Sequence, residues 1–328
     1  MTARDWARLL APYGRPQNLR GIAEICFTLL PFIALWAAIG VLVSSGYWVG
    51  MLLTIPAAAF LVRLFMIQHD CGHGSFFSSR TANNWTGRAL GVLTFTPYFF
   101  WKRSHTIHHS GSGSLSRRGF GDINTLTVEE YRGLSKWAQL RYRLYRHPLV
   151  MFGVGPGYLF LLDQRLPLGQ MRGGWRPWVS TMGTNLSMAL LSAVLIWFVG
   201  WEVFLLVQLP VTVLAATFGV WLFFVQHQFE DTTWDHDDTW NWHEAALYGS
   251  SHYDLPQPLK WFSANIGLHH IHHLSSRIPY YRLSRVIKDY PDLINVNRLT
   301  LFESFKCVPL ALWDESRRTM VSFAKAGA

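Results

Sequence analysis

Four long hydrophobic runs set the pattern of the chain, and they occur as two pairs. Residues 25–44 and 47–67 are joined through a Ser-Ser-Gly turn, and residues 178–199 and 203–226 through Gly-Trp-Glu. Each run has roughly 20 residues, which as an α-helix is enough to cross the hydrocarbon core of a bilayer. The pattern predicts an all-α integral membrane protein whose four transmembrane helices form two hairpins.

Two shorter hydrophobic stretches are not expected to cross. Residues 91–101 are too few, and residues 149–162 contain three glycines and a proline, which indicates an interfacial or re-entrant segment. A signal peptide is the alternative interpretation of the first long run, but its hydrophobic region would be shorter and no second run would follow. Pro31 and Pro210 are expected to kink their helices, which a bundle tolerates.

The basic residues lie largely outside the long runs, and this decides how the net charge of +9 is interpreted. All 29 Lys and Arg fall in residues 1–20, 63–176 and 260–328, and neither hairpin turn contains one. By the positive-inside rule these three segments are cytoplasmic. Half of the residues are hydrophobic and 15% are charged, against about a quarter charged in soluble proteins. A basic nucleic-acid-binding face is therefore not expected.

These features predict a division of the chain into three parts. Residues 1–20 form a cytoplasmic N-terminal segment, residues 21–274 a membrane domain, and residues 275–328 a cytoplasmic tail. The polar segments are expected to form a helical cap on the cytoplasmic side of the two hairpins.

The three cysteines exclude some kinds of site. Cys26, Cys71 and Cys307 are far apart and form no C-x-x-C motif, which argues against a rubredoxin-type or zinc-ribbon site and against a disulfide framework. Cys71 lies among histidines, and it is either a soft metal ligand or a small packing residue.

Nine of the 14 histidines form a pattern, and all 14 lie outside the long runs. The motif H-D-C-G-H spaces two histidines four residues apart, while H-T-I-H-H and a later H-x-x-H-H space three at i, i+3 and i+4. Residues three and four apart share one face of an α-helix, so each motif is expected to present its imidazoles together. A further histidine follows the fourth run. The nine are His69, His73, His105, His108, His109, His227, His269, His272 and His273.

The predicted topology places all nine histidines on one side of the membrane. The first two motifs follow two crossings, and His227 and the third motif follow four. If residues 149–162 crossed the membrane, His227 and the third motif would face the opposite compartment. A shared site and a non-crossing segment therefore support each other.

Clustered imidazoles of this kind indicate transition-metal binding. A zinc site needs three or four ligands, so nine histidines are too many for one ion, and H-x-x-H-H is not the H-E-x-x-H of a zinc protease. Two ions with four or five ligands each fit the count, while iron, copper and zinc all remain open. The other five histidines are expected to be ordinary surface or packing residues: His147, His236, His243, His252 and His270.

The order of hairpins and histidine motifs resembles the membrane-bound fatty acid desaturases. The similarity covers roughly residues 20–300, and the segments VQHQFED and SANIGLHHIHHLSSRIPYYRL resemble the bacterial and cyanobacterial acyl-lipid branch near the Δ12 enzymes. The resemblance implies two iron ions held by the nine histidines, O2 as co-substrate, a fatty acyl lipid as substrate, and an external electron donor such as ferredoxin, cytochrome b5 or a reductase. No HPGG haem motif occurs, so a fused cytochrome b5 domain is not expected.

The resemblance also implies that the diiron centre itself is the catalytic group. We expect it in a bacterial inner membrane, on the cytoplasmic side that the basic residues predict. No separate catalytic acid or base and no substrate-binding residue is indicated. Asp70, Glu230 and Asp231 lie beside proposed ligands and are candidates to orient imidazole N–H groups. Asn265 is a candidate to hold a water near the metals.

Two other functions remain as alternatives. A diiron hydroxylase or ketolase acting on alkanes, acyl chains or carotenoids would share the metal site and would add oxygen to its product. A metal transporter or sensor would need ionisable residues within the membrane runs, where only Glu24 and Arg63 occur near the ends. This scarcity counts against a transporter, while analysis of the product would separate a desaturase from a hydroxylase or ketolase.

Overall fold

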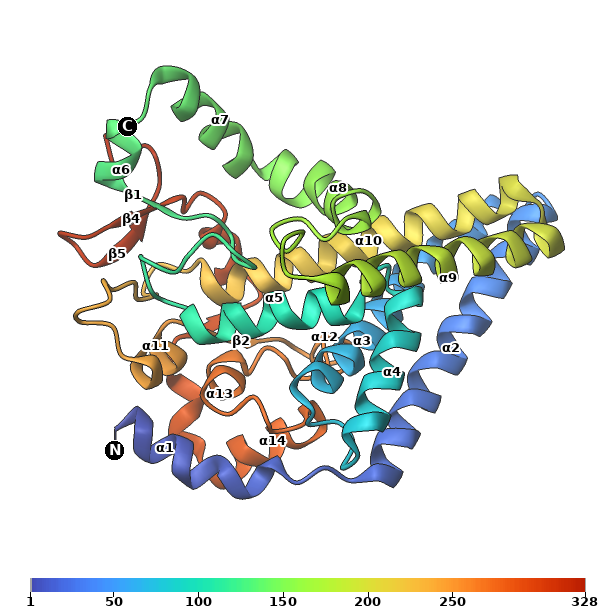
Figure 1. Ribbon diagram of the computed structural model, residues 1–328, viewed down its shortest axis with the longest axis horizontal. Coiled ribbons are helices and arrows are strands. Elements are labelled where there is room, and N and C mark those ends of the chain that lie inside the picture. The colour runs from blue at the N-terminus through green and yellow to red at the C-terminus, as the bar shows by residue number, and fades with distance from the viewer. Residues whose placement is uncertain (1, 328) are drawn as a thin grey trace.

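Four helical segments are long and apolar enough to cross a membrane, as the hydrophobic runs predict. The computed structural model describes residues 2–327. The candidate spans in that range are α2 (Asn18–Ser44), η2 with α3 (Trp48–His73), α9 (Trp175–Val199) and α10 (Trp201–His227). Figure 1 shows α2, α9 and α10 converging towards one end of the molecule. The prediction of a mostly helical chain with four membrane helices in two hairpins is confirmed.

Glycines close both hairpins. Gly46 follows α2 with a φ of 82°, and Gly200 alone connects α9 to α10 with a φ of 81°. These left-handed conformations are open to glycine because it has no Cβ. After the first turn, η2 (Trp48–Leu53) leads directly into α3 (Thr54–His73). Pro31 and Pro210 both lie inside helices that continue on either side of them.

The helix α3 is the centre of the bundle. It packs against α2, α10 and α4 (Arg80–Leu93). In the span Trp48–His73, of which α3 is the larger part, 56% of the most apolar stretch is buried, against none of that of α9. Side chains of α9 such as Leu190 and Trp197 are correspondingly exposed. Lipid tails are as apolar as leucine, so this exposure costs nothing in a bilayer.

Neither of the shorter hydrophobic stretches is a span. Residues 91–101 form the end of α4, a turn and the start of α5 (Tyr98–Gly111). Residues 149–162 form a π-helical turn, η3 (Leu149–Val154), and α8 (Gly155–Leu161), and both pack against α10. Among residues 2–327, the candidate spans include neither segment, as expected for a topology in which all the histidine motifs share one side.

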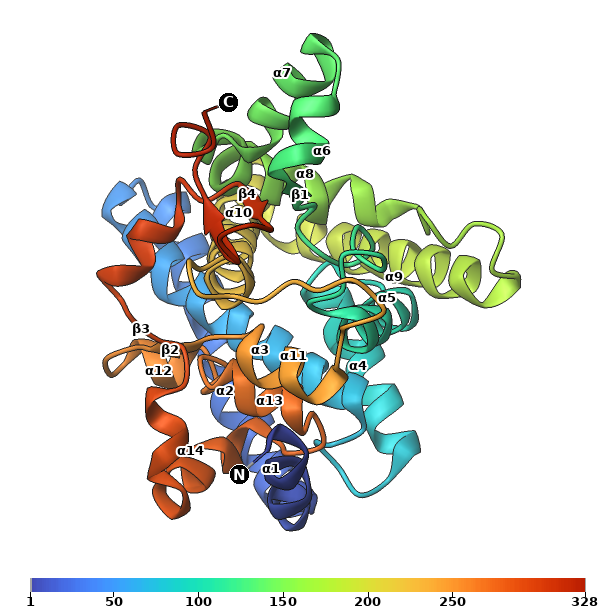
Figure 2. The same ribbon diagram turned by 90° about the vertical axis from the view of Figure 1, so that its left-hand side faces the viewer.

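The histidine motifs lie on four helices that meet at one end of the bundle. The C-terminal ends of α3 and α10 reach this end, where α5 and α13 (His269–Leu274) join them. Figure 2 looks on to it and shows α3, α11 (Trp242–Tyr248) and α13 near the centre. The short helix α1 (Ala3–Leu10) packs against α11 and α13, so the N-terminal segment is part of the cover of this end.

The tail also covers this end, and it is less helical than expected. Two small sheets are present: β1 (Leu126–Thr127) pairs in parallel with β4 (Leu312–Asp314), which pairs antiparallel with β5 (Thr319–Val321), while β2 (His252–Asp254) pairs in parallel with β3 (Arg298–Thr300). Strands of two or three residues leave too short an alternating pattern to be recognised in sequence. The remaining elements are η1 (Ala11–Gly14), α6 (Val128–Gly133), α7 (Lys136–Arg146), η4 (Asp163–Arg165), α12 (Leu259–Phe262), α14 (Tyr280–Asp289), η5 (Pro291–Asn295) and η6 (Glu303–Cys307).

Candidate metal centre

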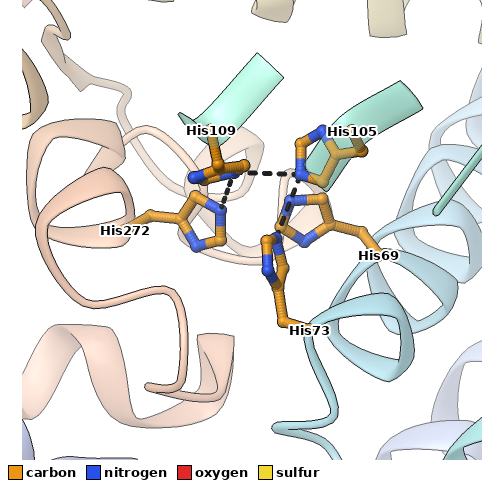
Figure 3. Close-up of side chains that lie close together, drawn as sticks. All are labelled: His69, His73, His105, His109 and His272. Carbon is orange, nitrogen blue, oxygen red and sulfur yellow. Dashed lines mark hydrogen bonds between the residues drawn. The ribbon is translucent and has the colours of Figure 1, made fainter. Parts of the chain in front are cut away.

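The nine histidines singled out in the sequence come together as two adjacent groups. In each group, one ring nitrogen of every histidine lies within 4.8 Å of one from every other member. Figure 3 shows the imidazoles of the five-histidine group pointing towards one another from three helices. The five-histidine group is His69, His73, His105, His109 and His272, and the four-histidine group is His108, His227, His269 and His273.

The two H-x-x-H-H motifs are each divided between the groups. On α5, His105 and His109 belong to the five-histidine group, while His108 belongs to the other. On α13, His269 and His273 belong to the four-histidine group, while His272 belongs to the five-histidine group. Successive residues of a helix point about 100° apart. The histidine at i+3 of each motif therefore points in a different direction from the histidines at i and i+4. One helix can therefore serve two adjacent sites.

The nitrogen separations fit ligands of common metal ions. The Nε2 atom of His105 lies 3.0 Å from that of His73 and 3.1 Å from that of His109. In the four-histidine group, His269 and His227 are 2.9 Å apart by the same atoms. Nitrogen ligands about 2.1 Å from one ion and at right angles to one another lie about 3 Å apart. The residues present therefore fit a pair of histidine-bound metal ions.

Burial prepares these rings for metal binding. It lowers the pKa of His109 and of His273 well below the ordinary histidine value, and the charges of neighbouring imidazoles lower it further. The same causes lower the pKa of His105, His269 and His272. Rings with such low pKa values are neutral at physiological pH, which is the form that binds a metal ion.

One histidine in each group is held by an aspartate. The Nδ1 of His69 donates to Asp70 Oδ1 at 3.1 Å, and the Nδ1 of His108 donates to Asp122 Oδ1. A ring held through Nδ1 turns its Nε2 towards the metal position, which is the usual role of such carboxylates. Asp70 was expected from the sequence to do this, and Asp122 was not.

A glycine turn brings Asp122 to the site. Gly121 has a φ of 76°, and a Cβ at this position would lie 2.9 Å from the Ser104 carbonyl oxygen of α5. The loop therefore runs directly against the second histidine motif. The G-F-G-D sequence was the only available signal, and a glycine-rich loop alone does not reveal which helix it meets.

Within residues 2–327, no hydrogen bond joins the other three polar candidates to an imidazole, so the orienting roles expected of Glu230 and Asp231 and the water-holding role expected of Asn265 stay predictions. The Glu230 carboxylate lies 3.5 Å from Lys325 Nζ and is mostly exposed. Asp231 is exposed as well. Because α10 ends at His227, helical spacing does not determine where Glu230 and Asp231 lie relative to the His227 ring. Asn265 instead joins α14, accepting from Ser284 Oγ at 3.0 Å and donating to the Tyr280 carbonyl oxygen at 3.4 Å.

The remaining histidines and Cys71 lie outside both groups. His270 and His252 hydrogen-bond the carbonyl oxygens of Leu293 and Ile294, at 2.9 and 2.6 Å, and so fasten η5 to the site. His236 pairs with Glu315 at the surface. Cys71 is buried, and its carbonyl oxygen accepts from the Tyr98 hydroxyl at 2.8 Å. His147 and His243 are also outside the two groups.

A largely apolar cavity borders both histidine groups. It has a volume of about 400 Å³, and its lining includes His69, His105 and His269. Trp101 also lines it and stacks on His105, with ring centroids 4.7 Å apart. The sequence indicated no lining residue, because hydrophobic residues of a cavity and of a core have the same pattern. Much of the apolar wall comes from α3, α8 and α10, including Leu61, Phe65, Phe160, Val220 and Phe223.

Comparisons with known proteins agree with the site. The family model described as fatty acid desaturase matches residues 46–301. The chain is 42% identical to a fatty acid desaturase of Bacillus subtilis over 98% of this chain and 90% of that protein. It is 32% identical to an sn-1 acyl-lipid omega-3 desaturase (ferredoxin) of Synechocystis, covering 68% and 62% of the two chains. It is 24% identical to an sn-1 oleoyl-lipid 12-desaturase of Anabaena variabilis, covering 74% and 71%. The chain belongs to the fatty acid desaturase family.

Proposed function

We propose that the protein introduces a double bond into lipid-linked fatty acyl chains, using O2, a pair of histidine-bound iron ions and an external electron donor. The observation that supports this most is the apolar cavity, because it borders both histidine groups. An acyl chain in the cavity would lie beside both metal positions at once. The overall reaction removes two hydrogen atoms from adjacent methylenes, and O2 with two electrons and two protons becomes two waters.

The nine histidines would hold the irons, five around one ion and four around the other. When bound, the irons supply the oxidising power that acid and base side chains lack for an unactivated C–H bond. The protein's own contribution is to keep the rings neutral through burial and to hold His69 and His108 through Asp70 and Asp122. The enclosed site also keeps water from the substrate.

The cavity wall would select the position of attack by shape. An acyl chain in a bilayer is already out of water, so moving it into the cavity gains little hydrophobic free energy. How far the acyl chain enters the cavity is then set by packing against the wall and by the carrier group that stays outside. We propose a Δ12-type position from the resemblance to the Δ12 branch, and the relatives named as omega-3 desaturases define the main alternative.

The electron donor and the location follow from similar arguments. The name of the Synechocystis relative specifies ferredoxin, and we propose ferredoxin, cytochrome b5 or a reductase as the donor here. We propose that the site lies on the cytoplasmic side of a bacterial inner membrane, and the basic segments 1–20, 63–176 and 260–328 support this orientation.

Mapping of new double bonds tests this function. The chain is expressed with ferredoxin and a ferredoxin reductase in a bacterium whose lipids contain saturated and monounsaturated acyl chains, and the lipids are analysed by mass spectrometry. We expect new double bonds with the wild type and none with His272→Ala. The matched control His147→Ala changes an exposed ring outside both groups and should retain activity.

Three results would contradict the proposal. Lipids that gain oxygen instead of a double bond would indicate a hydroxylase or ketolase. An unchanged lipid profile with iron-loaded protein and a working reductase would exclude desaturation of these substrates. Changed metal uptake by the cells, without any new lipid, would indicate a transporter.

A further inference from the structure

A buried network of charged and aromatic residues connects the N-terminal span to His69. Its members are far apart in sequence: Glu24 lies in α2, Arg63 and Asp70 in α3, and Tyr280 at the start of α14. All four side chains are buried. The sequence shows only two isolated ionisable residues near the ends of apolar runs, and the structure shows that they pair.

Asp70 uses its two carboxylate oxygens in different directions. Oδ1 accepts from His69 Nδ1 at 3.1 Å, and Oδ2 accepts from the backbone N–H of Tyr280 at 2.7 Å. The side chains of neighbouring helical residues point about 100° apart. The Asp70 carboxylate therefore reaches the His69 ring only if another group holds it turned towards that ring. Tyr280 is the first residue of α14, where an N–H has no acceptor within the helix and is free to hold it.

Tyr280 is in turn held by its hydroxyl. This group donates to Glu24 Oε2 at 3.0 Å, so the residue is bonded at its backbone to Asp70 and at its side chain to α2. Its ring stacks on Phe76, with centroids 6.1 Å apart. Residue 280 therefore has a fixed place relative to both α2 and α3.

Arg63 balances the charge of Glu24. The guanidinium lies 2.5 Å from Glu24 Oε2, and a second guanidinium, that of Arg20, lies 2.7 Å from Oε1. Arg63 also donates to the carbonyl oxygen of Trp261 and lies 4.0 Å above its ring. A buried ion pair of this kind adds little net stability, but removing one partner leaves an expensive unpaired charge. What the ion pair does contribute is a fixed position for Glu24 Oε2, the atom that accepts from the Tyr280 hydroxyl.

We propose that Glu24, Arg63 and Tyr280 form a positioning chain that fixes Asp70 and, through it, the metal-binding orientation of His69. This inference rests on the proposed metal centre. Within residues 2–327, His69 is the one ring of the five-histidine group with a hydrogen bond to a carboxylate, whereas the buried Nδ1 of His272 has no partner. The positioning chain therefore acts on the ion of the five-histidine group and leaves the four-histidine group unaffected.

The test measures metal retention. Full-length protein in nanodiscs is loaded anaerobically with 57Fe2+ and equilibrated with a competing chelator, and retained iron is measured per site by Mössbauer spectroscopy. Removing a group that orients a ligand weakens metal binding about 10- to 100-fold, and we expect this for Asp70→Asn. For Tyr280→Phe, which acts through Asp70, we expect about tenfold, with loss at one iron site only.

Tyr281→Phe is the matched control. Tyr281 lies next to Tyr280 on α14, and its hydroxyl accepts from the Gln17 backbone N–H at 2.9 Å, so it also contacts the N-terminal region. It makes no hydrogen bond to Asp70 within the described residues. We expect Tyr281→Phe to retain both irons as the wild type does.

A double variant separates positioning from general destabilisation. Glu24→Gln with Arg63→Gln removes both charges of the pair, and it should weaken the same single iron site. Because Tyr280 belongs to the same positioning chain, adding Tyr280→Phe should cause little further loss of iron affinity, as expected for coupled residues. Wild-type retention in Tyr280→Phe, equal loss from both sites, or additive losses would overturn the proposal. A wild type that binds no iron would refute the metal centre itself, and this inference with it.

Discussion

His108 and Asp122, 14 residues apart in the chain, form a hydrogen bond between the imidazole Nδ1 and a carboxylate oxygen. His69 and Asp70 repeat the arrangement in the five-histidine group. Each proposed metal site thus has one ring fixed by an aspartate. These two rings come from different helices, α5 and α3, so the two sites can be weakened separately.

Asp122→Ala should therefore weaken the four-histidine site and spare the other. Without the carboxylate, the His108 ring loses its preferred orientation, and we expect about a 10- to 100-fold loss of affinity at one of two iron sites. Chelator competition with purified protein measures it. Asp231→Ala is the matched control, since Asp231 is exposed and makes no hydrogen bond to an imidazole within residues 2–327. Equal retention in the two variants would contradict the role of Asp122.

A larger side chain at Gly219 should obstruct the substrate without affecting the irons. Gly219 lies on α10 and lines the cavity, and a Cβ there would meet no atom within 4 Å. We expect Gly219→Leu to retain iron and fold, and to lose most activity on long acyl chains or shift the double bond. Gly183→Leu on α9 is the control, because this position is equally open but faces outward. Unchanged product from Gly219→Leu would argue that the acyl chain binds elsewhere.

The metal-free protein should lose stability as the pH falls. Burial lowers the pKa of His105, His109, His269, His272 and His273 and brings that of His270 to about 3, so these rings stay neutral in the folded chain. In the unfolded chain they take up protons as the pH falls through about 6.5. The unfolded state then binds more protons, which destabilises the fold by at most about 1.4 kcal/mol per pH unit for each ring. The histidines concerned, outside the membrane spans, are His105, His109, His252, His269, His270, His272 and His273.

Thermal unfolding of chelator-treated protein in detergent checks this pH dependence. The midpoint should be level above about pH 7.5 and fall below about pH 6.5. Iron-loaded protein should unfold at a higher temperature throughout, because a metal that binds only the folded state adds to its stability. A midpoint of the metal-free protein that does not change between these pH values would contradict the neutral state of the rings.

The helix α7 should lie in the membrane interface. Trp137, Leu140 and Leu144 are exposed on one face of it, and Lys136 and Arg141 are exposed beside them. Such a basic amphipathic helix binds at the surface of an anionic bilayer. A spin label at Leu140→Cys, in a protein with Cys26 replaced by serine, should be accessible to O2 and shielded from a water-soluble nickel relaxant. A label at Asp238→Cys should show the reverse, and full aqueous exposure at position 140 would contradict this placement.

The spans and the nine histidines could be predicted because both depend on local patterns. A run of about 20 apolar residues has few alternatives to a membrane helix, and i, i+3, i+4 spacing fixes which side chains share a helix face. Asp122 could not be predicted, since a glycine loop brings it back to α5. The Glu24–Arg63–Tyr280 contacts join residues up to 256 positions apart, and no local pattern encodes them. The orienting roles expected of Glu230 and Asp231 stay predictions, because both acids lie past the end of α10, where helical spacing no longer relates them to His227.

Iron analysis of the purified wild-type protein combined with X-ray absorption at the iron edge tests the central claim most directly. The account predicts two irons per chain, each with nitrogen neighbours at about 2.1 Å and no sulfur, and loss of one iron in His272→Ala, whose ring lies in the five-histidine group. A single iron, a sulfur neighbour, or two irons retained in His272→Ala would contradict it.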